Sequence, residues 1–330
     1  MVSGFMCAHK GHEYIICSAV WLPLALFFVQ GYLEEFRIPR LIWTAVPLSL
    51  SILAGFPQIA LYSCALVLLY LIIGIFHSPK IKGWKVKLRQ VLGAACTLLL
   101  LTGLLASLPI FAVAETLPYL TRERLTYEMF TSDSFPPWQA LTFIIPNLFG
   151  GVDRDVPMYG PATTVFAAEV YPYLGLLPLA LALYCFTVRF AIGFPARFWM
   201  VATIVALLLA FGGMTPLYRL LFYVPIYNLF RVPARHLFEV NFAMSVLAAL
   251  GLDHLLRPPT VRRAEKPRRF LEGPYSQRPG SRQRLPSREV SKFDFLSRIS
   301  GQLPAIEPEG STRVRASLLI LTPIFGASLL

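Results

Sequence analysis

Long apolar runs separated by short polar loops dominate the chain. The hydrocarbon core of a bilayer is about 30 Å thick, and an α-helix crosses it with about 20 apolar residues. By that measure the chain holds about seven spanning runs and one incomplete run. The complete runs are 14–30, 41–55, 58–76, 90–113, 171–188, 198–213 and 236–256, and the incomplete run is 316–330. We therefore predict an all-α fold, a polytopic transmembrane helical bundle over residues 1–256.

The boundary between two neighbouring runs predicts a sharp turn. Runs 41–55 and 58–76 are separated only by Gly55, Phe56 and Pro57. Proline removes a helical hydrogen bond and clashes with the preceding turn, so it is a poor residue for a helix interior. We expect a tight helical hairpin here, and a continuous helix with a kink is the alternative.

Two further apolar segments do not have the character of spans. The segment from Trp138 to Gly151 is short and is broken by Pro146. Segment 214–235 has leucines at helical spacing and several tyrosines, whose amphipathic rings are favoured at membrane surfaces. We expect both segments to form re-entrant or interfacial helices at the outer leaflet.

The composition is that of an integral membrane protein. Hydrophobic residues make up 56% of the chain, charged residues make up 15%, and the mean hydropathy is +0.60. These values lie outside the range expected of a soluble domain. The net charge of +12 would suggest nucleic-acid binding in a soluble protein, but the excess lies in a C-terminal tail and in loops beside apolar runs. We therefore expect membrane lipids as partners, and no nucleic acid.

The distribution of Lys and Arg predicts the orientation in the membrane. Segments 31–40, 77–89, 189–197 and 257–315 carry 23 of these residues, whereas the segments expected on the other side carry 7. Because basic loops are usually cytoplasmic, the N-terminus is predicted to be extracytoplasmic. The tail 257–315 has eight prolines and fourteen Lys plus Arg, so we expect a disordered cytoplasmic segment. It is either a solvated linker or a binder of anionic lipid headgroups.

Arg231 and Arg235 are the most informative charged residues. An arginine costs about 2.5 to 3.5 kcal/mol at a bilayer centre, so the pair must lie at an interface or face a polar cavity. If Pro233 begins the next helix, the two guanidiniums share one face and form a fork for a phosphate or diphosphate group. The alternative is that both anchor the helix in the headgroup layer, with Arg235 paired to Glu239.

Two pairs of polar residues are candidates for metal or substrate contact. Asp153 and Asp155 have the spacing of a divalent-metal site that bridges a diphosphate, although this short motif is also common in polar loops. His9 and His12 place two imidazoles one turn apart, but no third ligand is near in the sequence. We therefore favour a structural or substrate-contacting role for these histidines over a metal site.

Glu169 lies just before run 171–188, at the predicted outer mouth of a span. A partly buried carboxylate there could act as a general base or contact a donor sugar, and the simpler interpretation is that it marks the water boundary. Glu115 has the same two interpretations. The centres of the runs carry almost no ionisable residue, which argues against an ion-coupled transporter.

A set of motifs in a fixed order resembles the YfhO-like family of bacterial membrane proteins. The set comprises Ser3-Gly-Phe-Met-Cys-Ala-His9-Lys-Gly-His12, Trp21-Leu-Pro23, Leu53-Ala-Gly55-Phe-Pro57-Gln58, Ile145-Pro-Asn-Leu-Phe-Gly150-Gly151, Tyr173-Leu-Gly175-Leu-Leu-Pro178, and the stretch from Pro225 through Arg231-Val-Pro233-Ala-Arg235 to Gly251. The resemblance covers residues 1–256. The family is similar to the C-type (GT-C) glycosyltransferases, polytopic enzymes that transfer a sugar from a polyprenyl-phosphate carrier at the outer face of the membrane.

The resemblance implies roles for the candidate residues in a bacterial plasma membrane. Basic side chains would hold the phosphate of a polyprenyl-phosphate-linked sugar, and a carboxylate would deprotonate the acceptor hydroxyl. The candidates for phosphate or lipid-carrier binding are Arg231, Arg235, His9 and His12, and the catalytic candidates, chosen by position, are Glu169 and Asp153. A divalent metal ion on Asp153 and Asp155 is the cofactor that these residues would suit.

Two departures from the family pattern leave alternatives open. Family members usually begin with further helices and a first outer loop that carries the catalytic carboxylate, and this chain starts after that point. The tail after Arg257 does not resemble the family's next spans, as in a truncated or frame-shifted product. The prediction is therefore a glycosyltransferase or an incomplete copy of one. A non-catalytic, lipid-binding scaffold is the second class, and a transporter of lipid-linked sugars is the least favoured.

Overall fold

The computed structural model describes residues 3–116, 119, 125–150 and 167–257. These residues form helices, turns and loops, and among them the only β-type pairing is one isolated bridge between Leu148 and Gly150. The predicted all-α class is confirmed for this part of the chain. The predicted tail beyond Arg257 and the incomplete run 316–330 lie outside the described residues.

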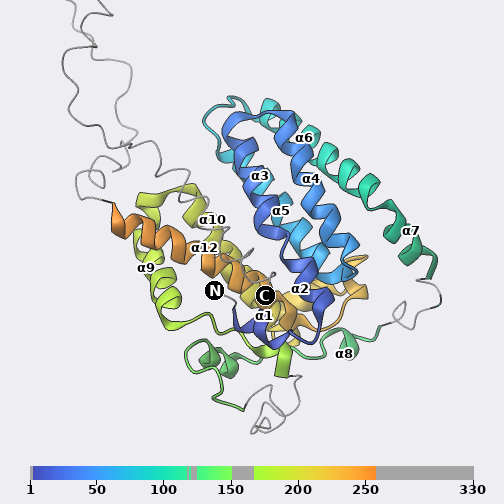
Figure 1. Cartoon of the computed structure of the whole chain (residues 1–330), viewed down its shortest axis with the longest axis vertical. Helices are drawn as coiled ribbons and strands as arrows, with labels where there is room; N and C mark the ends of the chain where they lie inside the picture. The colour runs from blue at the N-terminus through green and yellow to red at the C-terminus, as the bar shows by residue number, and fades with distance from the viewer. Residues whose placement is uncertain (1–2, 117–118, 120–124, 151–166, 258–330) are drawn as a thin grey trace, which may run out of the picture. The chain divides into compact units, whose positions relative to one another are not determined.

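The first half of the chain forms a group of packed helices (Figure 1). They are α2 (Glu13–Ala19), α3 (Leu22–Glu35), α4 (Ile38–Leu53), α5 (Pro57–His77) and α6 (Trp84–Leu105). Helices α3 and α4 pack along each other, α4 also packs on α6, α5 contacts all three, and the short α2 contacts α4 and α5. The first helix, α1 (Gly4–Ala8), instead contacts η5 (Ala167–Val170) and α12 (Leu237–Leu256).

The rest of the described chain, after α6, contributes three long helices and several short elements. The long helices α9 (Leu176–Ile192), α10 (Phe194–Ala210) and α12 (Leu237–Leu256) pack on one another. The short elements are α7 (Ser107–Thr116), α8 (Tyr127–Phe130), η3 (Pro137–Phe143), η5 (Ala167–Val170), η6 (Gly212–Met214), α11 (Pro216–Leu221), η7 (Tyr227–Leu229) and η8 (Pro233–His236). The segments predicted to be interfacial, 138–151 and 214–235, thus contain only single turns or short helices where they are described.

Among the described residues, four helical segments are long and apolar enough to cross a membrane, judged by length and composition. They are Glu13–Glu35, Pro57–His77, Trp84–Leu105 and Pro233–Leu256. These segments correspond to four of the predicted runs. Helices α4, α9 and α10 match further runs and are apolar, but each falls below this length.

The predicted run 90–113 is not one helix, which corrects the expected boundary. Helix α6 ends at Leu105, and α7 begins at Ser107. Proline has no amide hydrogen, so Pro109 cannot donate to the carbonyl of Leu105 as a continuous helix would require. In its observed place Pro109 lies in the first turn of α7, where no donor is needed.

The predicted hairpin between α4 and α5 is observed. Gly55 has a positive φ of 87°, which glycine adopts without steric cost, and Pro57 is the first residue of α5. Because Pro57 begins a helix, its missing amide hydrogen is not needed there. The alternative of one continuous kinked helix does not occur.

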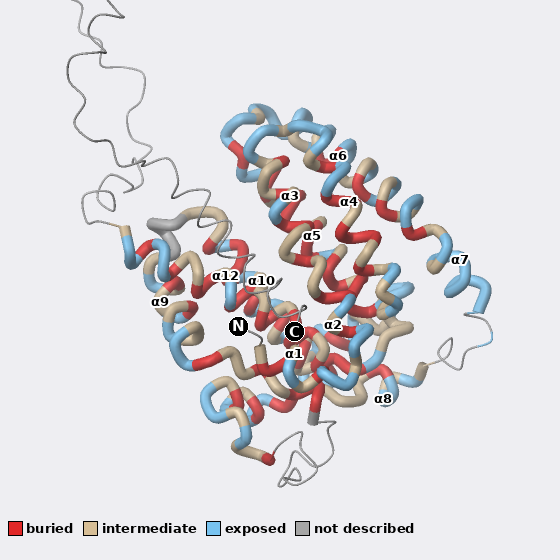
Figure 2. The backbone as a smooth tube through the Cα atoms, viewed as in Figure 1, coloured by how far each residue is buried: buried red, intermediate tan, exposed pale blue. Residues whose placement is uncertain are grey.

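Helix α6 has one apolar face that packs against other helices and a second apolar face that is exposed. Its buried side chains form one stripe, Val91, Ala94, Leu98 and Thr102. Leucines cover the other side, where Leu100 is 71% exposed and Leu104 is 68% exposed. Figure 2 shows that the exposed surface continues along α7, which has no buried residue. A leucine-covered face of this extent suits contact with lipid rather than with water.

Contacts between loops show which helix ends lie together. The ammonium group of Lys80 donates to the carbonyl of Glu34, and the ring of His77 stacks on Phe194 with centroids 4.9 Å apart. The helix junctions within segments 31–40, 77–89 and 189–197 therefore meet at one end of the helices. These are the segments that the distribution of basic residues assigned to one side.

A close approach between α9 and α12 gives a test of the packing. A Cβ atom at Gly251 would lie 2.5 Å from the carbonyl oxygen of Leu181, whereas one at Gly103 in α6 meets nothing within 4 Å. We expect Gly251→Ala to lower the free energy of unfolding by about 1 to 3 kcal/mol, because α9 must move away. Gly103→Ala, the matched control, should be neutral or stabilising by up to about 1 kcal/mol. Thermal unfolding in detergent measures the change in stability of both variants. Equal changes would contradict the close approach of α9 and α12 at Gly251.

Candidate functional site

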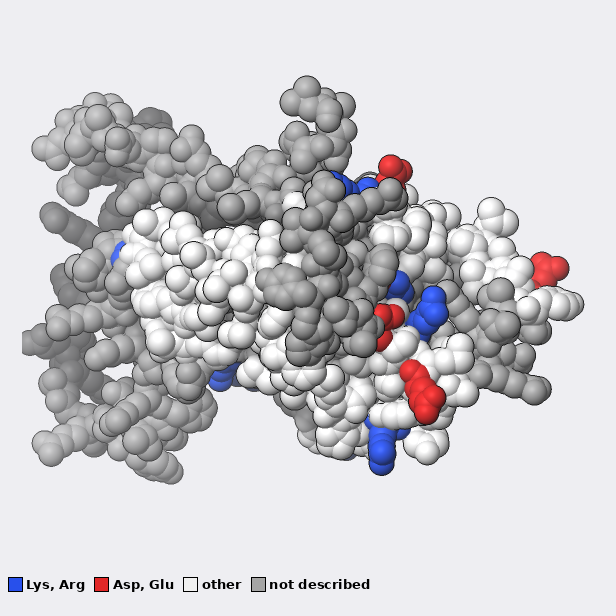
Figure 3. Space-filling model, turned by 90° about the horizontal axis from the view of Figure 1, so that it is seen from below, with Lys and Arg blue, Asp and Glu red and all other residues white. Residues whose placement is uncertain are grey.

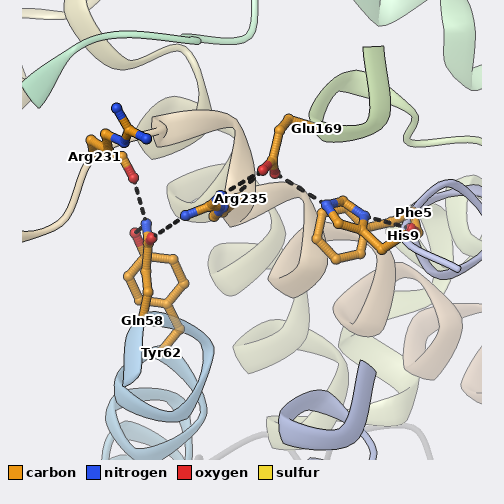
Figure 4. A network of polar contacts seen from close by, with 7 residues as sticks. All are labelled: Phe5, His9, Gln58, Tyr62, Glu169, Arg231 and Arg235. Carbon is orange, nitrogen blue, oxygen red and sulfur yellow. Dashed lines mark hydrogen bonds and ion pairs between the residues drawn. The ribbon is translucent and has the colours of Figure 1, made fainter. Parts of the chain in front are cut away.

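The carboxylate of Glu169 lies at the centre of a buried ionic network (Figure 4). Glu169 belongs to η5, and its side chain is 5% exposed. One carboxylate oxygen, Oε1, accepts hydrogen bonds from Nε and Nη2 of Arg235 at 2.9 and 2.7 Å. The other oxygen, Oε2, lies 3.2 Å from Nε2 of His9. Residues far apart in the sequence, from α1, η5 and η8, therefore meet on a single carboxylate.

His9 caps the end of α1 and is fully buried. Its Nδ1 lies 2.8 Å from the carbonyl oxygen of Phe5, and its ring packs on the Phe5 ring with centroids 4.2 Å apart. A carbonyl and an ionised carboxylate can only accept hydrogen bonds. His9 therefore joins the end of α1 to Glu169, with one ring nitrogen facing each acceptor.

Arg235 is held on three sides. Its Nη1 donates to Oε1 of Gln58 at 2.7 Å, its other donors face Glu169, and its guanidinium lies 4.9 Å from the Phe56 ring centroid. Nε2 of Gln58 in turn donates to the carbonyl of Arg231 and to the hydroxyl of Tyr62, both at 2.8 Å. The network therefore links the start of α5 to η8.

The charges around Glu169 control its protonation. Burial by itself would raise the pKa of this carboxyl group. The hydrogen bond from His9 and the charge of Arg235 act in the opposite direction, and together they hold the pKa below its usual value. Glu169 is therefore ionised at neutral pH, as the geometry of its three donors requires.

The backbone before η8 directs Arg235 toward Glu169. Val232 has a φ of 68° and a ψ of 74°, a left-handed conformation that is rare for a β-branched residue and costs about 1 to 3 kcal/mol. The conformation is held because Val232 is buried and the amide of Ala234 donates to the carbonyl of Asp133 at 3.3 Å. This sharp turn separates Arg231 from Arg235.

The two arginines consequently do not form the predicted fork. Pro233 begins the 3-10 helix η8 rather than α12, and Arg231 precedes the turn, so the two side chains do not share a helix face. The Arg231 side chain is exposed, and in Figure 4 no hydrogen bond or ion pair joins it to Glu169. Arg235 pairs with Glu169 and not with Glu239, which instead lies against His236.

The other predicted candidates lie in different surroundings. The ring of His12 lies 5.7 Å from that of His9. Glu115, at the end of α7, is exposed. Asp153 and Asp155, the candidates for catalysis and for metal binding, lie outside the described residues. Within the described part of the chain, no group of three His, Cys, Asp or Glu side chains is placed to hold a metal ion.

A second polar cluster, missed by the sequence analysis, lies beside the first. Nδ1 of His236 is 2.5 Å from Oε2 of Glu239, and Nε2 of His236 is 2.6 Å from the hydroxyl of Tyr227. The Tyr62 ring stacks on His236 at 4.0 Å. The sequence signal was the spacing of His236 and Glu239, three residues apart in the first turn of an apolar helix.

The surface on the side of α1 and α8 carries both basic and acidic side chains. Figure 3 views the protein from below, the side on which α1 and α8 lie in Figure 1. In the described part of this face, basic and acidic side chains lie near one another on a mainly uncharged surface. Recognition of an anion here would therefore depend on individual residues rather than on a broad basic field.

Comparisons with protein-family models, with curated proteins and with solved structures found no match to this chain. The resemblance to YfhO-like proteins therefore stays a prediction from the motifs.

The buried ionic network predicts a specific dependence of stability on pH. Because the pKa of Glu169 is lower in the folded protein, its contribution is complete above the unfolded value of about 4.3 and is lost as the pH falls through the folded value. Glu169→Gln should cost about 3 kcal/mol at pH 7, since it leaves Arg235 buried without its counter-charge. It should also flatten the acid part of the stability curve.

Thermal unfolding in detergent between pH 7 and pH 3 measures this effect. Glu115→Gln removes an exposed carboxylate and is the matched control, which should follow the wild-type curve. If Glu169→Gln also followed the wild-type curve, the network would not contribute to stability.

Proposed function

We propose that this chain is a bacterial plasma-membrane protein of the GT-C glycosyltransferase type, or an incomplete copy of one. In this proposal a sugar is transferred from a polyprenyl-phosphate carrier at the outer face. The observation that carries the proposal is the free guanidinium of Arg231. It is exposed, and among the described residues it has neither an ion pair nor a hydrogen bond.

The position of Arg231 suits a lipid phosphate. Its backbone is held by Gln58 at the start of the apolar helix α5, and it lies just before η8 and the apolar helix α12. A phosphate bound here would have apolar helix surface beside it for the prenyl chain, and a guanidinium gives two parallel hydrogen bonds to phosphate oxygens. The donors of Arg235 are already used by Glu169 and Gln58. In this proposal the phosphate therefore binds to Arg231 and not to Arg235.

The proposed reaction needs a group that takes a proton from the acceptor hydroxyl. Glu169 can do so only by giving up a contact with Arg235 or His9, since both of its oxygens are occupied. We therefore assign Glu169, with His9, to holding the site, and we keep Asp153 as a carboxylate candidate for catalysis. A divalent metal ion on Asp153 and Asp155 remains part of this proposal.

The proposed topology has seven spans with the N-terminus outside. Helices α4, α9 and α10 have 16, 17 and 17 residues. At 1.5 Å per residue they reach about 24 to 26 Å, a few ångströms less than the hydrocarbon thickness. Local thinning of the bilayer or tilt of neighbours accommodates such a mismatch. The loop with Lys80 is then cytoplasmic, and Arg231 is outside.

One observation favours a second candidate, a non-catalytic lipid-binding scaffold. The carboxylate of Glu169 is saturated by Arg235 and His9, an arrangement that stabilises the fold without any reaction. In this alternative Arg231 would bind a lipid headgroup, and no sugar would be transferred. Transfer of radiolabelled sugar from polyprenyl-phosphate glucose, mannose or galactose in membranes that contain the chain separates the two candidates.

The phosphate role of Arg231 predicts a loss of affinity without a loss of stability. Arg231→Ala should weaken binding of radiolabelled polyprenyl phosphate by about tenfold, because hydrogen bonds to charged groups contribute about 1.5 to 3 kcal/mol. The unfolding temperature should not change, since the side chain makes no contact that holds the fold. Arg219→Ala, an exposed arginine of α11, is the matched control. Equal loss in both variants would point to general charge and against a specific site.

A further inference from the structure

Glu239, His236 and Tyr227 form a continuous chain of hydrogen bonds that the proposed function does not yet use. Oε2 of Glu239 lies 2.5 Å from Nδ1 of His236, and the hydroxyl of Tyr227 lies 2.6 Å from Nε2 on the opposite side of the ring. A carboxylate, an imidazole and a hydroxyl in this order form the arrangement by which proteins activate a hydroxyl group.

The donor and acceptor in each bond follow from the groups themselves. The ionised carboxylate of Glu239 only accepts, so Nδ1 of His236 carries the hydrogen. In the neutral ring Nε2 is then an acceptor, and the Tyr227 hydroxyl donates to it. Burial, together with the nearby Tyr62, Tyr218 and Glu239, raises the pKa of Tyr227, so its hydroxyl keeps its proton at neutral pH.

The imidazole is held rigidly by its neighbours. The Tyr62 ring from α5 stacks on it at 4.0 Å and 19°, and the Tyr227 ring from η7 stacks with centroids 6.1 Å apart. The titratable and charged groups in and beside this cluster are Tyr62 of α5, Tyr218 of α11, Tyr227 of η7, Arg235 of η8 and Glu239 of α12. The Tyr218 ring also contacts Tyr227, at 6.2 Å.

Tyr227 lies in the same short segment as Arg231, the residue proposed to bind the phosphate. Tyr227 and Glu239 are partly exposed, whereas Tyr62, Tyr218 and His236 are buried, so Tyr227 is the tyrosine of the cluster that lies nearest to the surface. The segment that carries both Tyr227 and Arg231 has positive φ at each end, 71° at Ile226 and 68° at Val232. Such outliers in β-branched residues persist only where the surrounding structure enforces them, and they cluster at functional sites.

We propose that Tyr227, in place of the carboxylate candidate Asp153, accepts the proton of the acceptor hydroxyl during sugar transfer and passes its own proton to Nε2 of His236, with Glu239 as the positioning residue. The inference rests on the proposed function. The acceptor O–H bond breaks as its oxygen bonds to the anomeric carbon of the sugar. The bond from that carbon to the phosphate oxygen breaks, and polyprenyl phosphate leaves with the electron pair.

The proton ends on His236, which returns it to solvent after the products leave. The two proton transfers occur in one step, because a free phenolate in this buried cluster would be costly. Glu239 stabilises the imidazolium that forms. No oxidant, reductant or further reactant is needed.

The test is the pH dependence of transfer from radiolabelled polyprenyl-phosphate sugars in membranes that contain the full chain. Tyr227→Phe should lower kcat by about 100-fold or more with little change in KM, the usual size of an acid–base contribution. His236→Gln should cause a similar loss and remove the acid limb of the rate profile, since a neutral imidazole is required. Glu239→Gln should move that limb to lower pH, because the imidazolium loses its counter-charge.

Two matched controls separate the relay from a structural role. His254 lies in the same helix and is 3.1 Å from the Tyr184 hydroxyl, so His254→Gln removes an equivalent tyrosine–histidine contact at the other end of α12. Tyr223→Phe removes an exposed hydroxyl close to Tyr227 in the sequence. Both variants should keep the wild-type rate and pH profile, and binding of polyprenyl phosphate verifies that each variant is folded.

The possible results separate the relay from the proposed function. If the wild type transfers sugar and folded His236→Gln or Tyr227→Phe keeps the wild-type rate and acid limb, the relay is wrong and the transferase stands. If the wild type binds polyprenyl phosphate but transfers none of the labelled sugars, both the relay and the transferase proposal are overturned, and the lipid-binding scaffold takes their place.

Discussion

The arrangement of this protein's polar end depends on one buried charge, the carboxylate of Glu169. Removing a carboxylate from water costs several kcal/mol, and only closely placed cations with good hydrogen-bond geometry offset that cost. Arg235 supplies two hydrogen bonds to one oxygen, and His9 faces the other. Because these partners come from α1 and η8, the charge fixes the N-terminal segment and the start of α12 with respect to η5.

This constraint explains why the two arginines have different environments. The guanidinium of Arg235 is required to balance Glu169, so its donors point inward and Gln58 takes the remaining one. The strained turn at Val232 then places Arg231 outside the network. A regular α-helical backbone from Arg231 to Arg235 would have put both arginines on one face. The buried carboxylate and the strained turn are thus two parts of one arrangement.

The sequence predicted most of the helices because their signals are local. Apolar length locates α3, α5, α6 and α12, and Gly55 with Pro57 locates the hairpin. The break between α6 and α7 was missed, although Pro109 marks it, because hydropathy does not register a missing amide hydrogen. Each local rule works within a few residues of the feature that it predicts.

The site was predictable only as separate residues. His9, Glu169 and Arg235 were each identified as candidates, but their pairing joins positions 160 and 66 residues apart, and no spacing rule reaches that far. For the same reason the alternative in which Arg235 pairs with Glu239, one turn away, is wrong, since the observed partner, Glu169, lies in a distant element. The cluster of His236 and Tyr227 was missed because both residues read as ordinary members of an apolar, aromatic segment.

The amide of Gln58 joins the two clusters and gives them a common orientation. Arg235 can only donate, so Oε1 of Gln58 must face it, and Nε2 must then face the hydroxyl of Tyr62 and the carbonyl of Arg231. The Tyr62 ring in turn sets the plane of His236 by stacking. The charge on Glu169 therefore fixes Arg235, Arg235 fixes the Gln58 amide, and the amide holds both Tyr62 and the backbone of Arg231. Through this sequence of contacts, one buried ion pair positions both Arg231, with its exposed guanidinium, and the Tyr62 ring that stacks on His236.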